Sequence, residues 1–207
     1  MVALYLENNQ LTDESSVDIS MMLADKPRLK KLNLSYNQFS DNGVLWIMTS
    51  LEKNQSLVLL SISSIGMGLE GAWALWDCLL KKPLLQKLFM DGNNIGPEGG
   101  VYVADGLWNM KQMINLHLAN CNIGKEGARA LAVGIGQMKN LSVLDLNGNK
   151  ILTDGCIAIM KELKANVSLT ELYLNSNFID VEGSLHVAEC LENKKYIAEL
   201  WLSYNNM

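Results

Sequence analysis

The stretch LKKLNLSYNQFSDNG (residues 29–43) has leucines three and then two residues apart, followed by an asparagine, an apolar residue and a glycine. The same arrangement returns every 28 residues along the whole chain, with no insertion or deletion. The repeats start at Met1, Leu29, Leu57, Leu85, Met113, Leu141, Leu169 and Ile197, which gives seven full units and a partial one. A fixed period of this length predicts a stacked repeat architecture.

Two apolar positions near the start of each repeat predict a short strand. The third residue past each start is leucine in all eight repeats, from Leu4 to Leu200, and the fifth is leucine, isoleucine or methionine. Alternating apolar residues put one face of a strand toward a core. We therefore expect eight strands that each bury the same two positions.

An asparagine follows the strand in six of the eight repeats, and Cys121 and Ile65 take its place in the other two. We expect this amide to turn inward and bond to main-chain groups, because a buried polar side chain costs free energy unless it is paired. Ile65 has no polar group with which to form these bonds. Its presence predicts weaker packing at this repeat and a distorted loop at residues 63–68.

The second half of each repeat predicts a helix. A glycine closes the turn in six repeats, and an acidic residue just before it suits the positive end of a helix dipole. Apolar residues then recur four apart, as at Val103 and Leu107 or Ile159 and Leu163. This spacing forms one face of a helix.

The combined pattern is L-x-x-L-x-L-x-x-N/C-x-L, that of leucine-rich repeats. With its 28-residue helical unit, the chain resembles the ribonuclease-inhibitor-like class, and NVSLTELYLNSNFIDVEG (residues 166–183) is similar to joints in the C-terminal arrays of NLR receptors. The resemblance implies an α/β fold: a single array over residues 1–207, wound as a right-handed solenoid or horseshoe. It places a parallel sheet on the concave side and α-helices on the convex side, and it implies a binding role.

The amino-acid composition limits the classes of partner that the chain is expected to bind. A hydrophobic content of 49% with 19% charged residues predicts a packed protein. A net charge of −5 and only two arginines argue against nucleic acid, which is bound by clustered basic residues. We expect no membrane partner and no signal peptide. Four cysteines in structural positions indicate a reducing compartment, and so a cytoplasmic location.

The fourth position past each start should face outward on the concave side, and four of its eight residues are aromatic, against 7% in the chain. Aromatic side chains are enriched at interface hot spots. The predicted partner-binding residues are Tyr173, Trp201, Asp145, Glu171, Glu199, Tyr204, His117, Phe89 and Tyr5. The alternative is that these aromatic residues only pack on one another across the sheet.

Two other groups have structural interpretations. Four tryptophans lie in the helical halves, and we expect Trp46, Trp73, Trp76 and Trp108 to fill space between helices, with a convex docking patch as the alternative. The lysine pairs at 81–82 and 194–195 predict solvated helix ends.

Chemistry is sparse in this sequence. Neither His117 nor His186 has a carboxylate, cysteine or histidine at ligand spacing, so we expect no metal. The serines at 61 and 63 lie about two strand spacings, roughly 10 Å, from His117, too far for a nucleophile and its base. We expect no cofactor and no enzymatic activity.

The leading hypothesis is an intracellular scaffold that binds a protein partner through the concave face. The alternatives are a regulator of a small GTPase, similar to GTPase activators of the RanGAP type, and a ligand-sensing fragment of an NLR-type receptor. Neither end of the array has a cap, which suggests a larger chain or an assembly.

Overall fold

The computed structural model describes residues 1–108, 110–192 and 194–207. Strands and helices alternate along the chain, and all strands belong to one sheet. The strands are β1 (Ala3–Tyr5), β2 (Lys31–Asn33), β3 (Leu59–Ser61), β4 (Lys87–Phe89), β5 (Asn115–His117), β6 (Val143–Asp145), β7 (Glu171–Tyr173) and β8 (Glu199–Trp201). The helices are α1 (Asp13–Ala24), α2 (Asp41–Ser50), α3 (Leu69–Leu79), α4 (Gly96–Leu107), α5 (Gly124–Gln137), α6 (Leu152–Leu163) and α7 (Val181–Leu191).

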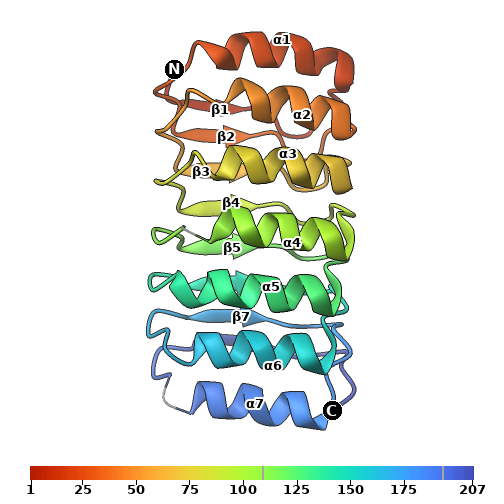
Figure 1. Ribbon diagram of the computed structural model, residues 1–207, viewed down its shortest axis with the longest axis vertical. Helices are drawn as coiled ribbons and strands as arrows, with labels where there is room; N and C mark the ends of the chain where they lie inside the picture. Colours follow the sequence, from red (N-terminus) through yellow and green to blue (C-terminus); the bar gives the residue numbers. More distant parts are fainter. Residues whose placement is uncertain (109, 193) are drawn as a thin grey trace.

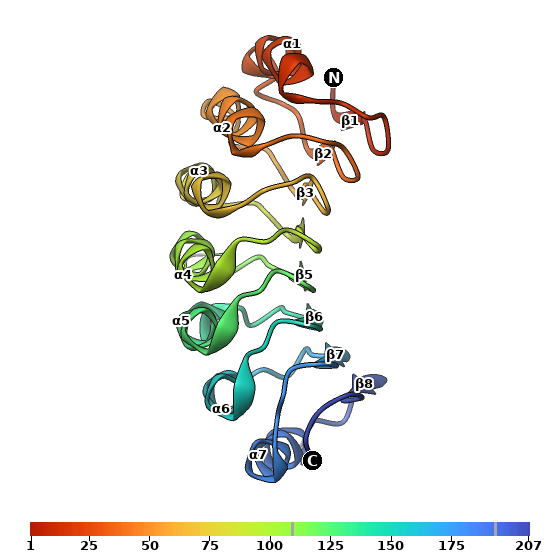
Figure 2. The same cartoon turned by 90° about the vertical axis from the view of Figure 1, so that its right-hand side faces the viewer.

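Neighbouring strands are parallel and lie in sequence order from β1 to β8 (Figure 1). Each strand pairs in a register of 28 residues, so that Leu32 is opposite Leu60 and His117 is opposite Asp145. Figure 2 shows the strands along the inner side of an arc and the helices along its outer side. The predicted solenoid, with a concave sheet and convex helices, is confirmed.

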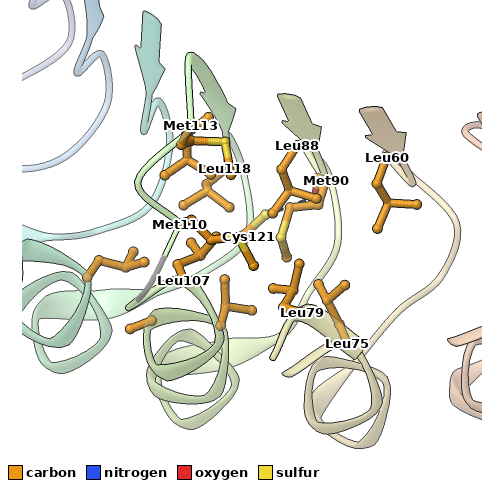
Figure 3. Packing of buried hydrophobic residues seen from close by; sticks show 14 of the residues in the cluster. Leu60, Leu75, Leu79, Leu88, Met90, Leu107, Met110, Met113, Leu118 and Cys121 are labelled. Carbon is orange, nitrogen blue, oxygen red and sulfur yellow. Dashed lines mark hydrogen bonds between the residues drawn. The ribbon is translucent and has the colours of Figure 1, made fainter. Parts of the chain in front are cut away.

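The core lies between the sheet and the helices. Leucines at the third position past each start are fully buried from β2 to β7, and they pack against the inner faces of the helices. Figure 3 shows Leu60 and Leu88 pointing toward Leu75 and Leu79 of α3. Only the end strands differ, with Leu200 of β8 39% exposed.

The asparagine after the strand turns inward as predicted in the repeats from Asn37 to Asn205, whereas Asn9 in the first repeat is exposed. Asn149 is fully buried, and its amide Nδ2 donates to the carbonyl oxygens of Leu118 at 2.6 Å and Leu146 at 3.0 Å. Its Oδ1 accepts the backbone N–H of Cys121 at 3.0 Å. Each amide therefore joins its own turn to that of the preceding repeat.

The two substituted positions behave differently from each other. The Cys121 thiol donates to the Met90 carbonyl at 3.2 Å, so it replaces part of the amide's role. Ile65 is buried and has no such group. The expected distortion around it was wrong, because Gly66 has the positive φ (84°) that Asn122 and Lys150 also adopt at the same position of their repeats.

The prediction of solvated helix ends was wrong for one lysine of each pair, Lys82 and Lys194, whereas Lys195 is exposed and Lys81 is partly exposed. Lys82 is fully buried, and its ammonium donates to the Leu51 carbonyl at 3.0 Å, while Lys194 donates to the Leu163 carbonyl at 2.8 Å. Lys82 occupies the repeat position held elsewhere by the buried Met110 and Met138. Position in the repeat, rather than charge, decides its burial.

This burial predicts a pH-dependent stability. Burial lowers the pKa of the Lys82 ammonium from its ordinary value of 10.5. The unfolded chain, in which the Lys82 pKa is about 10.5, therefore binds more protons than the folded one. The resulting loss of folding stability is complete below the folded-state pKa and disappears as pH rises through 10.5. We expect Lys82→Met to stabilise the protein by roughly 1 to 2 kcal/mol at neutral pH.

Urea unfolding of wild type and Lys82→Met across the alkaline range measures this effect. The gap between the two proteins should narrow as pH rises. The Cys78 thiol, whose pKa burial raises to about 11, is close enough to Lys82 that the ammonium charge lowers this pKa. Both proteins therefore carry Cys78→Ala, so that this thiol does not ionise in either. A variant less stable than wild type at every pH would contradict the assignment.

Three of the four helix-side tryptophans do not fill space between helices. Trp46, Trp73 and Trp108 are 58%, 46% and 47% exposed. Trp76 is half-buried, and its indole N–H donates to Asp105 at 2.6 Å. The expected packing role was therefore wrong for three of them. None of the helices described is long and apolar enough to cross a lipid bilayer.

Candidate functional site

The outward-facing strand residues form two neighbouring groups on the concave face, which meet where Asp145 lies opposite Tyr173. We call the first the C-terminal patch, made of Glu171 and Tyr173 on β7 with Glu199 and Trp201 on β8. Parallel pairing places Tyr173 directly opposite Trp201, and their rings meet edge to face with centroids 5.5 Å apart. Trp201 remains 51% exposed, so much of its surface is open to a partner.

The two glutamates of the C-terminal patch converge on one hydroxyl. The Tyr173 Oη lies 2.8 Å from a carboxylate oxygen of Glu171 and 2.8 Å from one of Glu199. Partial burial and these hydrogen bonds raise the pKa of the Tyr173 phenol above its ordinary value. A phenol has a single proton, so it donates to only one of the two carboxylates at a time.

The patch is therefore short of hydrogen-bond donors and rich in negative charge. In the part of the chain that the structure describes, neither Glu171 nor Glu199 forms an ion pair. A cationic side chain placed beside Trp201 would supply donors to both carboxylates. It would also meet an aromatic ring, which attracts cations.

The second group, which we call the central cluster, contains Phe89, Asp91, His117 and Asp145. The His117 ring stacks against Phe89 with centroids 4.7 Å apart and planes tilted by 30°. His117 Nδ1 lies 3.8 Å from an oxygen of Asp145. Partial burial raises the pKa of the Asp145 carboxyl, and the nearby Asp91 carboxylate raises it further.

The remaining predicted residues stand apart from these groups. Tyr5 is 53% exposed on β1, at the opposite end of the strand order from β7 and β8. Tyr204 follows β8 in a left-handed conformation (φ 58°) and is 87% exposed. Asp145 lies opposite His117 on one side and Tyr173 on the other, and an oxygen of its carboxylate is 3.8 Å from His117 Nδ1. The roles of all nine residues in binding stay predictions.

Asp91 is the residue that sequence reasoning missed. From the sequence we expected no carboxylate at ligand spacing from His117, yet the structure places Asp91 and Asp145 there. Asp91 stands six residues past its repeat start, just beyond β4, and Asp145 stands four past its own, in β6. The prediction compared residues only at the same position of successive repeats. A comparison of the fourth and sixth positions past each start would have found the cluster.

Comparison with known families agrees with the repeat geometry. The family model described as "Leucine Rich repeat" matches residues 27–47, 81–104, 113–132 and 137–160, each of which covers strand and helix segments seen here. The chain is a leucine-rich repeat protein. No curated protein matches this leucine-rich repeat chain.

Solved structures show distant similarity to this leucine-rich repeat protein. The leiomodin-1 actin-binding site 2 is 17% identical with a TM-score of 0.40, and the match covers 94% of this chain and 80% of that one. An internalin from Listeria monocytogenes is 13% identical with a TM-score of 0.37, and the match covers 100% of this chain and 82% of the internalin chain. At these values neither structure informs function.

Proposed function

We propose that this leucine-rich repeat protein is a protein-interaction scaffold that binds its partner through the concave face, centred on the C-terminal patch. The observation that carries the proposal is the half-exposed Trp201 held edge to face against Tyr173, between two glutamates. Solenoids use their extended concave surfaces for binding. Rigid aromatic residues give large contact area at low entropic cost.

The charge of the patch selects the partner's chemistry. Glu171 and Glu199 share one phenol proton, so a Lys or Arg side chain is the group that satisfies both. Arginine fits best, because its planar fork bonds carboxylates and stacks on aromatic rings. The partner we propose is a protein with a basic segment, and we propose binding rather than catalysis as the role of this face.

The proposed compartment is the cytoplasm. All four cysteines are free and buried: Cys78, Cys121, Cys156 and Cys190. Burial raises the pKa of the Cys121 and Cys156 thiols to about 12, which keeps them neutral and unreactive. Unpaired thiols in a folded core suit a reducing environment.

Affinity capture with matched variants tests the proposal. Wild type, Tyr173→Ala/Trp201→Ala and the convex control Trp46→Ala are each used as bait in native lysate, with quantitative mass spectrometry as the readout. We expect proteins with basic segments to be enriched on wild type and on Trp46→Ala, and lost from the double variant. Partners that are retained equally by all three baits would refute a concave site.

A further inference from the structure

We propose that Asp91, His117 and Asp145 form a binding site for a divalent transition-metal ion, with Zn²⁺ as the best fit. One ligand atom from each residue lies within 4.8 Å of the other two. Two atoms bound to one tetrahedral Zn²⁺ at about 2.1 Å lie about 3.4 Å apart. The His117 Nδ1 and Asp145 oxygen are near this separation at 3.8 Å, and side-chain shifts of roughly an ångström close the set.

Backbone hydrogen bonds hold both carboxylates in place. Asp91 Oδ1 accepts the backbone N–H of Ala119 at 2.7 Å, and Asp145 Oδ1 accepts that of Asn147 at 2.9 Å. The second Asp145 oxygen, Oδ2, is the one that lies 3.8 Å from His117 Nδ1, and the second Asp91 oxygen has one long contact, with the Ser63 hydroxyl at 3.3 Å. Metal ligands in proteins are oriented by such outer hydrogen bonds.

The histidine is positioned but not paired. Phe89 fixes its ring plane by stacking, and the 3.8 Å separation from Asp145 is too long for a hydrogen bond. Among the described residues no hydrogen bond to either ring nitrogen of His117 is present. A bound cation would use the free nitrogen and would also offset the repulsion between Asp91 and Asp145.

The donor set decides the class of ion. One imidazole nitrogen with two carboxylate oxygens suits zinc and its neighbours, whereas Mg²⁺ and Ca²⁺ prefer oxygen ligands alone. Three protein ligands also leave a coordination position open on the concave side. The buried thiols do not compete, because none of the four cysteines reaches the surface.

Isothermal titration of the whole chain with Zn²⁺ alone tests the site. We expect one Zn²⁺ per chain, and a loss of affinity of about tenfold or more in each of Asp91→Asn, His117→Gln and Asp145→Asn. His186→Gln is the matched control, because within the described part of the chain His186 has one carboxylate at ion-pair distance, Glu189 at 3.4 Å. This control should bind as wild type does.

Two further readouts guard against misfolded variants and unrelated binding. Thermal unfolding without metal should be similar in wild type and the three variants, and Zn²⁺ should raise the melting temperature of wild type only. The absorption spectrum of the Co²⁺-loaded protein should lack the near-ultraviolet charge-transfer band of a cobalt–thiolate bond. No Zn²⁺ binding, equal binding by all variants, loss in His186→Gln, or equal competition by Mg²⁺ would each overturn the proposal.

Discussion

Replacing Asn149 with alanine should lower the free energy of unfolding by roughly 3 to 5 kcal/mol. The side chain is fully buried in the middle of the array, where it donates to the Leu118 and Leu146 carbonyls and accepts from the Cys121 N–H. Alanine leaves these main-chain groups without partners. Each buried polar group left unsatisfied costs about 1 to 3 kcal/mol.

Urea unfolding followed by circular dichroism measures this change, with Asn94→Ala as the control. Asn94 is exposed, and its contact with the Asn122 side chain at 3.2 Å lies at the surface. Its loss should stay within about 0.5 kcal/mol. Similar losses in both variants would show that the buried asparagines do not tie neighbouring repeats together.

Alanine at both Tyr173 and Trp201 should weaken the captured partner's binding by about 1,000-fold, since each hot-spot side chain contributes about 2 kcal/mol. The pair forms its own contact at 5.5 Å, but Trp201 is half-exposed. Loss of stability should therefore stay below about 2 kcal/mol. Titration calorimetry with the purified partner measures the first effect, and thermal unfolding the second.

The electrostatic part of this binding has a separate signature. Glu171→Gln/Glu199→Gln keeps the shape of the patch and removes its charge. Binding to a basic segment should weaken, and its dependence on salt concentration should flatten. Trp46→Ala, on the convex side, should leave both properties unchanged. An unchanged salt dependence in the glutamine variant would contradict the proposal that the partner binds through a basic segment.

The fold was predictable because the repeat fixes the register. A 28-residue period without insertion puts Leu32 opposite Leu60, and the same step places Tyr173 opposite Trp201. The inward asparagines were predictable for the same reason, since the amide at this position bonds to main-chain groups of its own turn and of the preceding repeat, as Asn149 and Asn205 do. The constant repeat length therefore predicted both the buried leucines and the pairing of Tyr173 with Trp201.

Features that depend on a single repeat were not predictable. A lysine pair after a helix predicts solvent exposure, yet Lys82 takes a position that the repeat buries and that Met110 fills elsewhere. The exposure of Trp46 and Trp73 depends on how closely neighbouring helices pack, which periodicity does not define. Asp91 and His117 occupy different positions of their repeats, the sixth and the fourth past the start. A comparison of equivalent positions alone therefore missed their contact.

Carbene footprinting of the protein, free and bound to its captured partner, tests the central claim most directly. Tyr173 and Trp201 on the concave side and Trp46, Trp73 and Trp108 on the convex side are all accessible enough to label when free. Binding should protect Tyr173 and Trp201 and leave the three convex tryptophans labelled as before. Protection of the convex tryptophans, with Trp201 still labelled, would contradict a concave binding face.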